Sequence, residues 1–204
     1  KMSKTKQPIY VIILLILSGE AVFILPFVLV RIFRPTFLEV LDINNLQLGT
    51  CFSIYGIVAL FSYIFGGPLA DKYHPRYLIS VSLILTSIGG IYLSTYPDYS
   101  HLKYLYGFWG FTTIFLFWSA LIKATRIWGG TKKQGMAFGF LDGGRGLVAA
   151  VFGTVGILIF SLFIDVDISE TSLIERKEAF SYVILYSSVI VSIIGVLSFY
   201  LLKP

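Results

Sequence analysis

The sequence predicts an all-α integral membrane protein that crosses the bilayer six times. Its 204 residues are 56% hydrophobic and only 13% charged, with a mean hydropathy of +0.84, whereas soluble domains are about 25% charged. A soluble protein of this size could not bury so much apolar surface, so lipid must cover part of it. Long apolar segments joined by short connections make sequential helices antiparallel neighbours. The expected helices span residues 8–34, 46–70, 77–96, 102–127, 135–164 and 180–202.

The first two helices have recognisable limits. Residues 8–34 are too long for a signal peptide and lack its small-residue cleavage site. Pro35 should end or bend this helix, because proline has no amide proton to donate. Asn44 or Asn45 is a suitable N-cap for the second helix.

The remaining helices follow as apolar runs, and the fifth carries a stripe of small residues. Gly135, Gly139 and Gly143 recur at a spacing of four, and the stripe continues with Gly146, Ala149, Ala150, Gly153 and Gly156. Small residues let membrane helices approach closely, so we expect this stripe to serve mainly in helix packing.

The basic residues predict the orientation. With the N-terminus inside, the cytoplasmic side holds nine: Lys1, Lys4, Lys6, Lys72, Arg76, Arg126, Lys132, Lys133 and Lys203. The opposite side holds five: Arg31, Arg34, Lys103, Arg176 and Lys177. The excess of Lys and Arg on cytoplasmic loops therefore favours both termini inside. Because these charges are dispersed over short loops, a nucleic-acid partner is not expected.

Enzyme chemistry has no support in the sequence. The lone Cys51 excludes an intrachain disulfide, and His74 and His101 are too far apart to suggest a metal site. We find no nucleophile–base constellation. We therefore expect no enzymatic activity, no metal and no cofactor.

Glu20 lies about 12 residues into the first helix, roughly 18 Å deep and near the middle of the bilayer. An ionisable group at that depth costs about 2.5–3.5 kcal/mol to insert, which makes it a candidate for function. Glu20 could bind and release a proton as access to the site alternates. It could equally be a carboxylate paired with a neighbouring helix.

Asp142 and Arg145 are separated by three residues in the fifth helix, so they share a face and can pair. Arg145 is about 12 residues from Lys133, too deep to reach the headgroups easily. Its planar guanidinium suits a carboxylate or phosphate, so Arg145 could bind an anionic substrate while Asp142 holds it in place. The alternative is a self-contained structural ion pair.

Two further arginines are open to two interpretations. Arg31 either adds positive potential at the outer mouth of a cavity or reaches the membrane interface as an ordinary snorkelling residue. Arg126, like Lys123, is expected to be either an interfacial anchor or a determinant of the orientation.

A charged, turn-forming decapeptide, residues 67–76, separates the second and third apolar runs, and we expect it to be a tight loop. Its sequence is Gly-Pro-Leu-Ala-Asp-Lys-Tyr-His-Pro-Arg. This pattern resembles the signature loop between helices 2 and 3 of the major facilitator superfamily. Five residues match that signature: Gly67, Leu69, Asp71, Lys72 and Arg76. His74 and Pro75 depart from it. The resemblance implies that this signature segment (residues 67–76) acts as a conformational switch, with Arg126 as a possible gate partner of Asp71.

Two other stretches strengthen the resemblance. Pro35, Leu41, Asn44 and the Gln47-Leu48-Gly49 tripeptide resemble the junction of helices 1 and 2 in many facilitators. Residues 118–150 resemble helices 4 and 5 of the organic-anion and sugar-phosphate branches. Since facilitators usually have twelve helices, we expect the chain to be the N-terminal six-helix half of a longer transporter, with a six-helix protein working as a dimer as the alternative.

The resemblance implies a secondary active transporter of a small organic anion that works by alternating access, as a proton-coupled symporter or an anion exchanger. Arg145, Asp142 and Arg31 are the candidate substrate-binding residues, and Glu20 is the proton-coupling candidate. The expected partners are the anion, a proton or counter-anion, the lipid bilayer and a second six-helix half. The expected location is a bacterial inner (plasma) membrane with the N-terminus in the cytoplasm. A facilitator-like membrane sensor or scaffold is the alternative.

Overall fold

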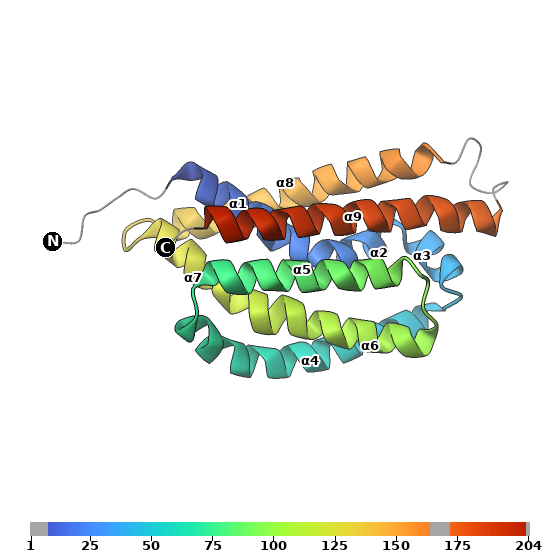
Figure 1. Ribbon diagram of the computed structural model, residues 1–204, viewed down its shortest axis with the longest axis horizontal. Coiled ribbons are helices and arrows are strands. Elements are labelled where there is room, and N and C mark those ends of the chain that lie inside the picture. The colour runs from blue at the N-terminus through green and yellow to red at the C-terminus, as the bar shows by residue number, and fades with distance from the viewer. Residues whose placement is uncertain (1–7, 164–171, 203–204) are drawn as a thin grey trace.

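The computed structural model describes residues 8–163 and 172–202, and within these ranges it contains helices and no strands. Helices long and apolar enough to cross a membrane form the bundle in Figure 1. Their bounds are Ile9–Ile32, Asn45–Lys72, Pro75–Leu93, Tyr99–Gly129, Gln134–Ser161 and Leu173–Leu201. The predicted six-helix membrane fold is confirmed.

The first span is not a regular α-helix throughout. It consists of α1 (Ile9–Phe23), a π-helical segment η1 (Ile24–Val28) and α2 (Leu29–Ile32). Pro26 lies within η1, and its missing amide proton favours such a local widening. The span ends at Ile32, and Phe33 joins it to α3 (Arg34–Val40), which has Pro35 near its start. The helix break that Pro35 predicted is present, and Pro35 belongs to the helix after it.

The start of α4 (Asn45–Lys72) is fixed by a reciprocal cap. The Asn44 side chain accepts a hydrogen bond from the Gln47 amide at 2.9 Å, and the Asn44 amide donates to the Gln47 side chain at 2.9 Å. Asn44 is therefore the N-cap, while Asn45 is the first helical residue.

The signature segment is not the tight loop that its composition predicts. Helix α4 continues through Pro68 to Lys72, and α5 (Pro75–Leu93) starts three residues later. Only Tyr73 and His74 separate the two helices. A proline is tolerated inside a membrane helix where neighbouring groups satisfy the freed backbone, and the His74 side chain caps α5 by accepting from the Arg76 amide at 3.4 Å.

The fourth span also contains a π-helical stretch. It runs through α6 (Tyr99–Gly110), η2 (Phe111–Trp118) and α7 (Ser119–Gly129). Asp98 caps α6, and the hydrogen bond that its carboxylate accepts from the His101 amide keeps the pKa of Asp98 below its ordinary value. The last two spans are α8 (Gln134–Ser161) and α9 (Leu173–Leu201).

Several helix limits differ from those predicted. Helix α9 begins at Leu173 and not at 180, because Ser172 and Glu175 form a capping box that extends the helix through a charged first turn. Helix α5 ends at Leu93 and not at 96. The predicted end of the fifth helix at 164 lies outside the described residues.

The first span is the centre of the bundle. In an apolar 18-residue window of this span 67% of the residues are buried, whereas the corresponding shares in the α4 and α8 spans are 28% and 17%. In Figure 1, α8 and α4 lie along opposite sides of the molecule with α5 and α9 between them. Helix α1 packs mainly against α8 and α9, and α5 packs against α9. The exposed flanks are apolar, as contact with lipid or another membrane segment requires.

Candidate functional site

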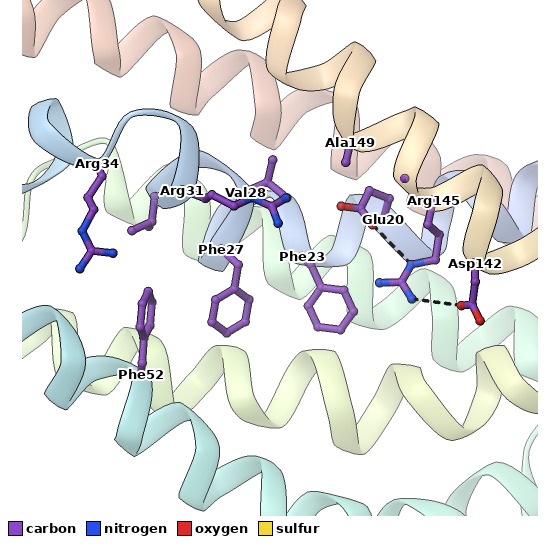
Figure 2. Close-up of a pocket in the computed structure, with 12 residues that line it drawn as sticks. Glu20, Phe23, Phe27, Val28, Arg31, Arg34, Phe52, Asp142, Arg145 and Ala149 are labelled. Carbon is purple, nitrogen blue, oxygen red and sulfur yellow. Dashed lines mark ion pairs between the residues drawn. The ribbon is translucent and has the colours of Figure 1, made fainter.

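A cavity of about 720 Å³ lies between the first span and α8. Figure 2 shows its aromatic and charged walls. Its lining residues are Glu20, Phe23, Phe27, Val28, Val30, Arg31, Arg34, Phe52, Asp142, Arg145, Gly146 and Ala149.

One helical stripe supplies much of this wall. The lining residues from Glu20 to Arg34 include Phe23, Phe27 and Arg31, each three or four positions after the previous one. Side chains at this spacing lie on the same face of a helix. The stripe places a carboxylate at one end of the cavity, aromatic rings along it and two guanidinium groups toward the other end.

Arg145 projects from α8 into the cavity and meets both predicted carboxylates. Its Nε lies 3.4 Å from Glu20 Oε2, and its Nη1 lies 3.8 Å from Asp142 Oδ1. The Glu20 side chain is 9% exposed and that of Asp142 is 73% exposed. Asp142 and Arg145 were expected to pair, and Glu20 joins them from the first span.

Aromatic rings complete the surroundings of this guanidinium. Its central carbon lies 5.6 Å from the centre of the Phe23 ring and 5.5 Å from that of Trp118. Cation–π contacts of this kind are worth about 0.5–2 kcal/mol. Arg145 is therefore held by protein groups and does not extend toward the headgroups.

Small residues allow α1 and α8 to approach each other around the ion pair. A Cβ on Gly19 would lie 3.1 Å from Arg145 Cδ, and one on Gly144 would lie 2.7 Å from Ile16 Cγ2. By contrast, a Cβ on Gly135, Gly139 or Gly143 would meet nothing within 4 Å. Farther along the stripe, a Cβ on Gly153 would lie 2.7 Å from Ile32 Cδ1. Close packing therefore involves the later part of the stripe and Gly144, and not its first three glycines.

Arg31 and Arg34 form the other charged end of the cavity. Arg31 lines the cavity, and Figure 2 shows its side chain extending toward Glu20. Arg34 donates two hydrogen bonds to Asn45 Oδ1, at 3.1 and 2.8 Å, which join α3 to α4. Within the described ranges, neither arginine forms an ion pair with a carboxylate. Arg34 was not predicted from the sequence as a site residue, because the helix break at Phe33 separates it from Arg31.

The signature segment lies away from the cavity and is held by α7. Lys123 Nζ donates to the carbonyl oxygens of Ala70, Asp71 and Tyr73, at 2.6, 3.3 and 3.4 Å. A cation at a helix C-terminus satisfies carbonyls that lack partners within the helix. Lys123 is thus a contact of this segment that the sequence analysis did not identify.

Other residues of the segment have different surroundings. Asp71 and Lys72 are exposed, and Gly67 and Leu69 are partly buried. The Arg76 guanidinium lies over the rings of Tyr77 and Phe199, 4.5 and 5.6 Å from their centres. Arg126 is exposed, and the described residues include no ion pair between Arg126 and Asp71. The gate between those two side chains remains a prediction.

In the ranges that the structure describes, no group of three or more His, Cys, Asp or Glu side chains could hold a metal ion.

Comparison with known proteins gives a family match. The family model described as Major Facilitator Superfamily matches residues 10–204. The chain is 31% identical to "Inner membrane protein YihN" of Escherichia coli (strain K12) over 159 residues, which are 78% of this chain and 38% of the relative.

Two further relatives have comparable similarity. "Inner membrane protein YqcE" of the same strain is 28% identical over 169 residues, 83% of this chain and 38% of the relative. "Uncharacterized protein MG294 homolog" of Mycoplasma pneumoniae (strain ATCC 29342 / M129 / Subtype 1) is 27% identical over 165 residues, 75% of this chain and 34% of the relative. The chain spans little more than a third of the length of these curated relatives. No solved structure matches it. With nearly all of its residues matched by the family model, the chain belongs to the major facilitator superfamily.

Proposed function

We propose that this chain forms one six-helix half of a secondary active transporter in a bacterial inner membrane, and that its cargo is a small organic anion. Membership of a family of membrane transporters supports the transport role. The names of the two Escherichia coli relatives support the location. The second half of the transport path would cover the exposed side of the cavity.

The choice of an anion as cargo rests on one observation, the position of the Arg145 guanidinium on the wall of the cavity. A guanidinium in the middle of an apolar bundle is retained at a cost of about 2.5–3.5 kcal/mol. Arg145 has its charge on the wall of a cavity large enough for a small metabolite. Arg31 and Arg34 add two guanidinium groups to the same cavity, and the planar fork of arginine matches the oxygens of a carboxylate or phosphate.

The aromatic wall favours a cargo with an apolar or ring-shaped body. Phe23, Phe27 and Phe52 line the cavity between its charged ends, and Phe27 packs against Phe52 with ring centres 5.4 Å apart. A phosphorylated or carboxylated sugar combines a ring with the required charge. Its charge would be bound by the arginines and its ring by the aromatic wall.

Glu20 is the proposed proton-coupling residue. Among the described residues it is the one acid that is buried, and it shares Arg145 with any bound anion. Protonation of Glu20 would leave Arg145 with one carboxylate fewer and so favour binding of the anion. This competition supports proton-coupled symport over anion exchange.

Flux measurements on the intact protein in proteoliposomes test the proposal. The probes are radiolabelled glucose 6-phosphate and glucuronate, one phosphorylated and one carboxylated sugar. We expect uptake of at least one probe and its loss in Arg145→Ala. Lys132→Ala is the matched control, because Lys132 is an exposed cation outside the spans and its removal should leave uptake unchanged.

Each other outcome has a defined meaning. Binding of a probe without flux would favour the sensor or scaffold alternative. Uptake that survives in Arg145→Ala would remove Arg145 from the binding site. Absence of both binding and uptake for both probes would contradict the assignment of an anionic sugar as cargo.

A further inference from the structure

The charges of the cavity are unevenly distributed along its length. At one end Arg145 has Glu20 and Asp142 beside it, so two carboxylates compensate one guanidinium. At the other end Arg31 and Arg34 line the cavity, and in the described part of the chain neither of them forms an ion pair. The long-range attraction for an anion therefore comes from the end that holds Arg31 and Arg34.

The two ends are too far apart to bind one charged group together. Glu20 lies about 12 residues before Ile32, the last residue of the first span, which is roughly 18 Å along the helix. Arg34 follows after the break at Phe33, and Figure 2 shows it at the opposite end of the cavity from Arg145. A small anion whose charged group binds Arg145 thus cannot place that group against Arg34.

Asn45 fixes the orientation of Arg34. The Nε and Nη2 atoms of Arg34 both donate to Asn45 Oδ1, at 3.1 and 2.8 Å, and Asn45 is the first residue of α4. Because this acceptor is neutral, the hydrogen bonds position the guanidinium without cancelling its charge. Nη1 takes no part in them and can donate to an oxygen of a ligand.

The acids closest to Arg34 in sequence are directed elsewhere. Glu39 of α3 pairs with Arg176 of α9. Asp42 lines a separate pocket together with Glu39, and neither carboxylate belongs to the lining of the cavity. The α3 end of the cavity therefore keeps an excess of positive charge.

We propose that Arg34 is an entry site, which attracts the anion to the α3 end of the cavity and binds it transiently before it moves along the aromatic wall to Arg145. This inference rests on the proposed anion-transport function, in which a second half covers the exposed side of the cavity and leaves its ends as the routes of access. Arg34 then controls association, and Arg145 controls release. A charge at the rim of a site alters mainly the association rate and its dependence on salt, whereas loss of a charge contact inside the site alters mainly the release rate.

Stopped-flow tryptophan fluorescence of the intact purified protein measures the two rates, because the Trp118 ring adjoins Arg145. The probe is glucose 6-phosphate at about pH 8, where a phosphate monoester carries two negative charges. For the wild type, the association rate constant should fall about tenfold between about 0.02 M and about 0.5 M salt, since screening removes the long-range attraction.

Asn45→Asp separates the charge of Arg34 from its position. Aspartate keeps the acceptor for both hydrogen bonds but cancels the charge of the guanidinium, so association at low salt should slow about fivefold. Arg34→Ala should slow it to a similar extent, and neither variant should change the release rate. Arg145→Lys keeps the charge but loses the planar fork, so it should instead speed release about tenfold.

Thr95→Asp is the matched control for the added negative charge. Thr95 is an exposed residue at the same end of the bundle and outside the lining of the cavity. Its replacement should leave both the association rate and its dependence on salt close to those of the wild type.

The outcomes distinguish the entry site from the proposed function. Association that keeps its rate and salt dependence in Arg34→Ala or in Asn45→Asp would overturn the entry site. Faster release in Arg34→Ala would also overturn it, because Arg34 would then belong to the final binding site. If Arg145→Lys still speeds release in either case, the anion site at Arg145 would stand. Failure of the wild type to bind glucose 6-phosphate would count against the proposed function as well.

Discussion

Arg145 has partners of two kinds, which together explain how a guanidinium persists inside the bundle. Glu20 and Asp142 balance its charge, while Phe23 and Trp118 present their rings to it. Loss of one partner from a buried pair costs about 3–5 kcal/mol, because the other charge is left uncompensated. Because of this pairing, the balance of charge around the Arg145 guanidinium changes when Glu20 is protonated or when an anion binds.

Glu20→Gln should uncouple transport from the proton gradient while it leaves anion exchange intact. Glutamine keeps the shape of the side chain but cannot take up a proton. With one proton per anion, an inward gradient of about one pH unit should raise accumulation by wild type about tenfold. In the variant this increase should vanish in a proteoliposome assay.

The control for this prediction is Glu178→Gln, which removes an exposed carboxylate far from the cavity lining. It should accumulate the anion as the wild type does. A Glu20→Gln protein that still responds to the gradient would show that another group carries the proton.

Two glycines in adjacent positions of α4 have opposite surroundings. A Cβ on Gly66 would lie 2.8 Å from the carbonyl oxygen of Phe115 in η2, whereas a Cβ on Gly67 would meet nothing within 4 Å. Backbone atoms cannot move aside as a flexible side chain can. The packing of α4 against the fourth span therefore depends on Gly66.

Gly66→Ala should lower the free energy of unfolding by about 1–3 kcal/mol, the usual cost of overpacking. Gly67→Ala is its neighbour and matched control, and alanine should stabilise the helix there by up to about 1 kcal/mol. Thermal unfolding of the two purified variants measures both effects. Equal stability of the two proteins would contradict the close contact between α4 and η2.

The junction of α4 and α5 should be sensitive to acid through His74. Burial, with the nearby charges of Arg76 and Lys123, lowers the pKa of His74 below its ordinary value of 6.5. On acidification the unfolded chain therefore binds a proton at this residue before the folded chain does. Stability from this site should be fully present above pH 6.5 and should fall as the pH drops toward the folded pKa.

Unfolding temperatures between about pH 7.5 and about pH 5.5 test this expectation. His74→Asn keeps a capping side chain without a titrating ring, so it should remove part of the acid sensitivity. His101→Asn serves as the control. An identical pH profile for wild type and His74→Asn would exclude His74 as the source.

The sequence predicted the helices better than it predicted their ends. Long apolar runs predict that a membrane span exists. They do not predict its ends: Lys72, Pro75 and Glu175 lie inside helices, although charged side chains and the proline ring suggested that the helices exclude them. The Ser172–Glu175 capping box could have been recognised in the sequence, whereas backbone contacts from other helices, such as those of Lys123 with the end of α4, could not. The same reasoning explains why η1, η2 and the role of Lys123 were missed.

The site was predictable in its members but not in its assembly. Depth along a helix singled out Glu20 and Arg145, because an intramembrane charge is rare. Which helices pack together decides that these two residues meet, and that Arg34 joins them in one cavity. Neither fact can be obtained from a single helix.

The helix termini of the whole molecule gather at two opposite ends. One end holds the beginning of α8, the Lys72 terminus of α4 and the start of α5, and the other holds Asn44, the start of α6 and the start of α9 (Figure 1). Of the basic residues that predict the orientation, Lys1, Lys4, Lys6 and Lys203 lie outside the described residues. The orientation therefore remains a prediction that rests on the positive-inside rule.

Cysteine labelling in whole cells measures the orientation. Lys132 and Thr95 are exposed residues in connections at opposite ends of the bundle. A membrane-impermeant maleimide should label Thr95→Cys in intact cells and Lys132→Cys only after lysis. The reverse pattern would place the N-terminus outside.

The claim that an anion binds in the cavity through Arg145 is tested most directly by protection of a cysteine inside it. Ala149 lines the cavity and is partly buried, while the native Cys51 is fully buried. Glucose 6-phosphate at about ten times its dissociation constant should slow maleimide labelling of Ala149→Cys about tenfold. We expect this protection when Arg145 is present and none in the Arg145→Ala background. Equal protection in both backgrounds, or no protection in either, would show that Arg145 does not bind the anion in this cavity.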